Sequence, residues 1–233
     1  MQTKLIHDVR AVKNKRELTS IVAAQRISEK VLLETLKKLR TGITELQVEA
    51  LIKKSFIKHG APILSFPPIV AFGKNSAYPH YRAGNQKLKK GDVVLVDIGV
   101  VVDKYHSDMT RTFFFGKADP RLIVLDSVVK KAHAAALAVC KKGAKVGDLD
   151  EAARKVIQAA GLENLILHSL GHGIGLETHE FPRLKYQGED HEAVLSEGMV
   201  ITIEPGLYLP GVGGIRHEDT IVITQKGYEN FYV

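Results

Sequence analysis

Apolar positions change their period along the chain, and the changes divide it into helices and strands. Between residues 17 and 40 they recur every three to four positions, which predicts one face of a helix. A second helix should open at Thr44 and end near Gly60, because a capping residue and a glycine bracket it. Residues 61–80 contain several prolines and favour loop and strand.

Later segments are richer in β-branched and aromatic residues. Gly91–Gly99 and Asp108–Phe115 are predicted to be two strands of one sheet. The other expected elements are helices over 121–142 and 148–160, short segments at 165–170 and 180–182 that flank a glycine-rich turn, and a final hairpin of 199–209 with 215–224.

The second half of the chain repeats the pattern of the first. From Gly91 to Gly99 the order is glycine, five residues, an acid, one residue and glycine, and the same order recurs from Gly198 to Gly206. A returning strand with a further acid follows each block. The repeat predicts two halves, about 10–116 and 117–233, each built as helix, helix and hairpin around a pseudo-two-fold axis.

Composition excludes several classes of protein. The 233 residues are 45% hydrophobic and 25% charged, which is typical of a soluble globular domain without a membrane span. Residues 1–16 lack the apolar segment of a signal peptide, and the single cysteine, Cys140, predicts a cytoplasmic location. The net charge is +7, but the lysines are scattered without interleaved aromatics, so we expect no specific nucleic-acid partner.

Two carboxylates stand inside apolar strands at equivalent positions of the repeat. Asp97 follows Val-Val-Leu-Val, and Glu204 follows Val-Ile-Thr-Ile. Asp108 and Glu218 lie on the returning strands. Buried carboxylates are costly unless cations compensate them, so four of them near one axis predict bound cations. Two divalent ions would balance four negative charges.

Histidines in a glycine-dense stretch strengthen this interpretation. His168, His172 and His179 are spaced four and seven residues apart. Imidazole mixed with carboxylate suits manganese, cobalt, iron or zinc better than calcium. We expect other histidines to be ordinary core or surface residues: His7, His59, His106, His133 and His191.

These motifs resemble those of a known family, over about residues 9–233. The motifs are Asp97 with Asp108 eleven residues later, Gly171-His172-Gly-Ile-Gly, His179-Glu180, Glu204-Pro-Gly206 and Arg216-His-Glu218-Asp219. They resemble the dinuclear metallopeptidases of the pita-bread fold, which include methionine aminopeptidase, Xaa-Pro aminopeptidase and prolidase. The resemblance implies an α+β fold with a curved, mostly antiparallel sheet and outer helices. It also implies one catalytic domain over residues 1–233, without the accessory N-terminal domain of the proline-specific members.

The closer resemblance is to the proline-specific branch. Asn75-Ser-Ala-Tyr-Pro-His80-Tyr, the stretch around Asp108, His168 and Arg216 are typical of that branch. His217 stands where the family usually has an apolar residue, and strand alternation should turn it away from the site.

The resemblance also implies roles for the site residues. Asp97 would bind one ion, His172 and Glu204 the other, and Asp108 and Glu218 would bridge them around a hydroxide nucleophile. The ions would be manganese or cobalt, with zinc and iron as alternatives. The remaining roles are oxyanion stabilisation by His179, substrate contact by His80, proton transfer by Glu204, orientation of Glu218 by Arg216 and lining of a proline pocket by His168.

The expected function is that of a metal-dependent exopeptidase that cleaves after an N-terminal residue preceding proline. Its partners would be short peptides or protein N-termini, and a homodimer is left open. Two alternatives remain at this point. One is a methionine aminopeptidase, and the other is a non-catalytic peptide- or protein-binding module on the same fold.

Overall fold

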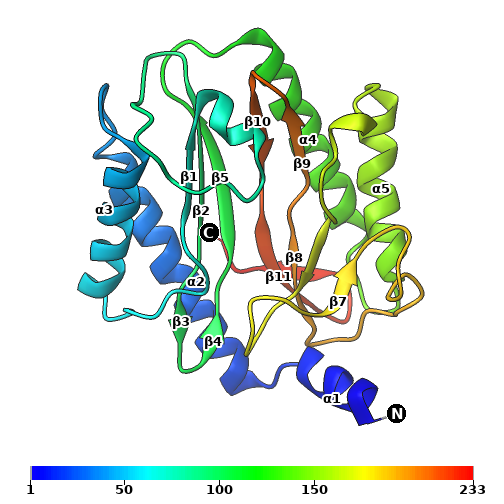
Figure 1. The fold of residues 1–233 in the computed structure, drawn as a ribbon. Helices are drawn as coiled ribbons and strands as arrows, with labels where there is room; N and C mark the ends of the chain where they lie inside the picture. Colours follow the sequence, from blue (N-terminus) through cyan, green and yellow to red (C-terminus); the bar gives the residue numbers. More distant parts are fainter. Residues whose placement is uncertain (1, 233) are drawn as a thin grey trace.

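Strands occupy the middle of the molecule and helices flank them, as Figure 1 shows for the computed structural model, which describes residues 2–232. Helices α2 (Lys15–Leu36) and α3 (Glu45–Lys58) lie on one side, and α4 (Pro120–Val139) and α5 (Val146–Ala159) lie on the other. Two helices followed by strands therefore occur twice along the chain.

Local capping explains where the first two of these helices begin. The Asn14 side chain accepts a hydrogen bond from the Glu17 amide at 3.1 Å, and the Glu17 carboxylate accepts one from the Asn14 amide at 2.7 Å. Thr44 and Gln47 make the same reciprocal pair at the start of α3. Each capping box satisfies amides that have no partner within the helix, so the predicted helix starts are correct to within two residues.

Helix α1 (Gln2–Ala11) was not predicted, because its sequence is polar on average. The structure docks it against strand β7 (Glu180–Leu184) through ion pairs, a stack of His7 on Phe181 and the buried Ala11. Glu180 accepts from Arg10 at 2.5 Å and from Lys13 at 3.3 Å. Ion pairs between residues so far apart in sequence leave no periodic signal.

The first sheet is antiparallel, with the order β1-β2-β5. Its strands are β1 (Ile69–Phe72), β2 (Val93–Ile98) and β5 (Met109–Phe114), and β3 (Val101–Val102) pairs with β4 (Tyr105–His106) beyond it. Asp97 of β2 pairs in register with Thr110 of β5. The two predicted strands of this half are therefore confirmed as neighbours.

The second half contains two ladders where the sequence predicts one hairpin. Strand β8 (Val200–Ile203) pairs with β11 (Asp219–Ile223), and β9 (Gly206–Leu209) pairs with β10 (Gly213–Arg216). Pro205 has no amide hydrogen to donate to a ladder, and it lies in the break between β8 and β9. The other elements are η1 (Gly73–Ala77), η2 (Glu163–Leu165), β6 (Gly171–Gly173) and β12 (Tyr228–Asn230), and the larger sheet has the order β12-β11-β8-β6-β7.

Apolar side chains fill the space between the helices and the strands on both sides. Phe56 of α3 and Phe72 of β1 belong to one buried cluster, and Val129 of α4, Leu149 of α5 and Ile203 of β8 belong to another. Within residues 2–232, no helix combines the length and the apolar character that a membrane crossing requires.

A buried carboxylate ties α3 to the loop that precedes β2. Glu45 is fully buried, and its two oxygens accept four hydrogen bonds: from the Phe72 amide at 2.8 Å, Asn75 at 3.0 Å, Tyr81 at 2.9 Å and the Gly84 amide at 3.0 Å. Burial and the Glu45 carboxylate raise the pKa of Tyr81 to about 12. This network fixes the segment that carries His80.

Glu45→Gln should therefore destabilise the protein by about 2–3 kcal/mol, since one of its oxygens becomes a donor that faces buried donors. Urea unfolding followed by circular dichroism measures this loss. Glu49→Gln on the same helix is the control, because Glu49 forms an i,i+4 ion pair with Lys53 near the surface, and it should cost less than about 0.5 kcal/mol. Equal losses in the two variants would contradict the role given to the network.

Candidate metal centre

Four carboxylates reach the middle of the fold because each stands in or beside a central strand. Asp97 is in β2, and Asp108 directly precedes β5. Glu204 directly follows β8, and Glu218 directly precedes β11. The breaks in the second pair of ladders thus place an acid at each interruption.

His172 of β6 joins this group. Its Nε2 atom lies 3.3 Å from Oε1 of Glu204 and 3.7 Å from Oδ2 of Asp108. Asp108, His172 and Glu218 each offer a ligand atom, and these atoms all lie within 4.8 Å of one another. The structure therefore brings together residues from both halves of the chain, as the sequence predicts.

Asp97 is held by Arg216, which is a correction to the expected contact. The Nη2 atom of Arg216 donates to Oδ2 of Asp97 at 2.5 Å. The guanidinium was expected to orient Glu218, but it reaches that residue only through Thr110. Thr110 accepts from Arg216 Nε at 2.9 Å and donates to Oε2 of Glu218 at 2.8 Å.

Burial and mutual repulsion make these acids hard to ionise together. Desolvation raises the pKa of Asp108 well above its usual range, and the neighbouring Glu218, Asp97 and Glu204 raise it further. Burial, together with the charges of Glu204 and Asp97, also raises the pKa of Glu218 well above its usual range. Burial also raises the pKa of Asp97, although Arg216 opposes the shift. The group is therefore short of positive charge.

Glu204 behaves differently because a hydrogen bond and nearby groups outweigh the effect of its burial. Burial alone would raise its pKa, but the hydrogen bond and charge of His172, with His168 and Arg216, lower it to about 2. Glu204 is therefore ionised at neutral pH.

The residues present fit divalent cations. Oδ1 of Asp97 and Oε1 of Glu218 are buried and have no hydrogen-bond partner among residues 2–232. Buried oxygens of this kind normally find a donor or an ion. Four carboxylates with one imidazole are a donor set that first-row transition metals accept.

Three further predicted histidines line a cavity beside the acids. The cavity has a volume of about 560 Å³, and it is lined by His80, His168 and His179 together with Asp97, Asp108, His172, Glu204 and Arg216. The ring centroids of His179 and His172 are 4.3 Å apart. Burial lowers the pKa of His179, and so does the charge of His172. His179 is therefore neutral at pH 7.

Sequence reasoning missed two hydroxyl groups at the site. Tyr208 is fully buried, and its hydroxyl accepts from Arg216 at 2.8 Å and lies 2.7 Å from Nε2 of His168. No local motif marks Tyr208. Thr110 could have been found, because strand alternation places it on the same face as Asp108.

Comparisons with known proteins agree with this geometry. Residues 19–225 match the model of Metallopeptidase family M24. The chain is 38% identical over 223 residues to a Xaa-Pro dipeptidase from Pyrococcus furiosus, covering 96% of this chain and 63% of that protein. A second relative, also named Xaa-Pro dipeptidase, is the one from Pyrococcus horikoshii, at 38% identity with the same coverage of both chains. The chain thus spans about three fifths of the length of these curated relatives.

Solved structures give the same result for the fold. The prolidase from Pyrococcus furiosus superposes with a TM-score of 0.95 at 37% identity, covering 99% of this chain and 67% of that one. An X-Pro aminopeptidase from Thermotoga maritima superposes with a TM-score of 0.94 at 36% identity. The match covers 99% of this chain and 64% of that one. The predicted α+β pita-bread fold is confirmed.

Replacing Asp108 by asparagine should make the metal-free protein more stable at pH 7 and change its stability little near pH 4. The raised folded-state pKa means that folding disfavours the ionised carboxylate. This penalty is absent below the unfolded-state pKa of 3.8 and grows as the pH rises from there toward the folded-state pKa. Thermal unfolding in a chelator at both pH values measures the difference.

The control for this measurement is Asp148→Asn, which alters an exposed carboxylate outside the group. It should leave the melting temperature nearly unchanged at both pH values. An Asp108→Asn protein that is less stable than the wild type in chelator at pH 7 would contradict the raised pKa.

Proposed function

The chain belongs to metallopeptidase family M24, and we propose that it is a metal-dependent exopeptidase. It would hydrolyse the bond after an N-terminal residue that precedes proline, as a Xaa-Pro aminopeptidase or dipeptidase does. The observation that carries the proposal is the convergence of Asp108, His172 and Glu218 beside a cavity large enough for a short peptide. The names of the relatives support the choice of substrate.

Membership of this family implies divalent metal ions, and the proposal assigns five ligands to two of them. Asp97 would hold one ion, His172 and Glu204 the other, and Asp108 and Glu218 would bridge the pair. The charge shortage among the acids supports this assignment, since two divalent ions supply four positive charges. Manganese or cobalt is the proposed metal, with zinc or iron as alternatives. When bound, such ions supply an activated water and a Lewis acid for the scissile carbonyl.

The chain's own residues would do the remaining work. His179 is neutral at pH 7 and borders the cavity, so one ring nitrogen can donate a hydrogen bond to the oxyanion. Glu204 lines the cavity with a carboxylate, which would accept a proton and pass it toward the leaving amine. His80 lies on the cavity wall, where it would contact the substrate main chain.

Proline preference is assigned to the wall that His168 forms. Its ring is fixed on both sides, by the Ser169 carbonyl at 2.8 Å and by the Tyr208 hydroxyl at 2.7 Å. A fixed imidazole presents a rigid surface to a rigid pyrrolidine ring. Arg216 stays a positioning residue in this proposal, since it orients Asp97 rather than Glu218.

The other expectations stay predictions: the repeat boundaries at 10–116 and 117–233, a homodimer, a cytoplasmic location and the lack of a nucleic-acid partner. The complete ligand set and the named relatives favour the peptidase over the two alternatives, a methionine aminopeptidase and a non-catalytic binding module.

Manganese-loaded protein should release alanine from an Ala-Pro-type peptide and leave a Met-Ala-type peptide nearly intact. Chromatography of both digests measures the rates, and Asp108→Asn serves as the inactive control against contaminating peptidases. Faster cleavage of the Met-Ala peptide would favour a methionine aminopeptidase. Cleavage of neither peptide by metal-loaded protein would favour the binding module.

His179→Ala should lower kcat by about a hundredfold, the scale of losing one oxyanion donor, with bound metal retained. Steady-state kinetics and elemental analysis of the same sample measure both quantities. An unchanged kcat at full metal content would remove His179 from that role.

A further inference from the structure

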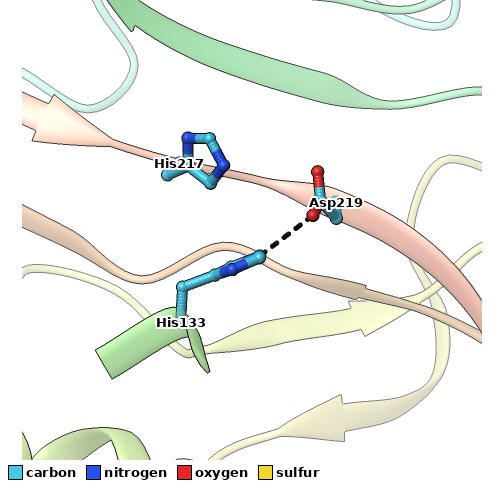
Figure 2. Close-up of side chains that lie close together, drawn as sticks. All are labelled: His133, His217 and Asp219. Atoms are coloured by element: carbon cyan, nitrogen blue, oxygen red, sulfur yellow. Dashed lines mark ion pairs between the residues drawn. The ribbon is translucent and has the colours of Figure 1, made fainter. Parts of the chain in front are cut away.

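A second group of possible metal ligands lies outside the carboxylate centre. His133 belongs to α4, His217 to the turn between β10 and β11, and Asp219 is the first residue of β11. Figure 2 shows the three side chains converging from the helix and from the strand. Each offers one ligand atom, and these atoms lie within 4.8 Å of one another.

The imidazole of His133 is arranged as metal-binding histidines usually are. His133 is 6% exposed, and its Nε2 atom has no hydrogen-bond partner among residues 2–232. That atom faces Oδ2 of Asp219 at 3.5 Å (Figure 2). A buried imidazole nitrogen that has no hydrogen-bond partner and lies beside a carboxylate oxygen is placed to bind a metal ion.

Asp219 is also held as a ligating carboxylate would be. Arg111 donates to Oδ1 at 2.6 Å, and Asn230 donates to Oδ2 at 2.8 Å. Both bonds come from protein groups that fix the plane of the carboxylate, and Oδ2 keeps a lone pair that faces His133.

His217 completes the group from the exposed side. Its ring lies edge-on to that of His133, with centroids 5.0 Å apart and an interplanar angle of 88°. The residue is half-buried, so an ion can reach the group past it and water can fill a fourth position. Bonds of about 2.0–2.1 Å to tetrahedral zinc place neighbouring ligand atoms about 3.3–3.4 Å apart, close to the observed separation of His133 and Asp219.

We propose that His133, His217 and Asp219 bind one transition-metal ion, with zinc as the best fit, at a site separate from the carboxylate centre. Two imidazoles and one carboxylate suit zinc better than calcium or magnesium, which prefer oxygen ligands. The ion would fasten α4 to the turn that carries Glu218, and its role is structural.

The carboxylate centre and the new site lie on opposite sides of the segment that leads into β11. Glu218 lies between His217 and Asp219 in sequence, and its side chain contacts Thr110 on the opposite side. Removing ions from one site should therefore leave the other able to bind.

Metal counting on the intact protein tests the proposal. Each protein is dialysed first against Zn²⁺ and then against buffer, and its zinc content is measured by elemental mass spectrometry. The His217→Ile and His133→Gln variants should each carry one zinc ion fewer per chain than the wild type. His7→Ala, at an exposed position, should keep the wild-type count. The Asp108→Asn variant should lose zinc from the carboxylate centre and keep the zinc ion bound by His133, His217 and Asp219.

Anomalous diffraction at the zinc edge gives a test that needs no variant. Crystals of the wild-type protein with Zn²⁺ should show a peak between the three side chains, apart from the peaks at the carboxylate centre. A wild-type map without that peak, or equal zinc counts in the wild type and both histidine variants, would overturn the proposal.

Discussion

Uncompensated negative charge in the interior is the constraint on which the rest of this structure depends. Asp97, Asp108 and Glu218 are buried, and Arg216 offsets only part of their charge. Such a group disfavours folding unless cations bind, because each carboxylate is both desolvated and repelled by its neighbours. The sheets hold the acids together despite this cost, which is expected when the site serves function rather than stability.

Interrupted strands are the means by which the fold gathers the acids. In the first half a continuous strand carries Asp97, and Asp108 enters the next strand beside it. In the second half Glu204 and Glu218 stand in breaks between ladders, where their backbones are free of regular pairing. Pro205 maintains one of these breaks, since it cannot donate to a ladder. The two halves share the spacing of glycine, acid and glycine, but the backbone around their acids differs.

Local patterns predicted most of the helices, the central strands and the residues that converge. The site residues could be predicted because a carboxylate is costly to bury in an apolar strand, and a carboxylate among apolar residues can be recognised in the sequence alone. They did not predict the partner of Arg216 or the buried hydroxyl of Tyr208, since these contacts join residues more than a hundred positions apart or depend on a strand break. Helix α1 was missed because its sequence is polar and its ion pair to Glu180 joins residues far apart in the chain. His133 looked ordinary in sequence because its neighbours come from the far end of the chain.

Arg216 couples the cavity wall to the charged group. It donates to Asp97 and to the Tyr208 hydroxyl, and that hydroxyl in turn contacts His168. A chain of three hydrogen bonds therefore connects His168 to the Asp97 carboxylate. Burial raises the pKa of Tyr208 to about 12, which keeps the hydroxyl protonated and able to link a donor on one side with an acceptor on the other. Because Arg216 donates to that oxygen, the phenol hydrogen is left for Nε2 of His168, and the Ser169 carbonyl accepts from Nδ1. The Ser169 carbonyl, which can only accept, sets the tautomer of His168, and the Tyr208 hydroxyl that Arg216 holds is oriented to match it.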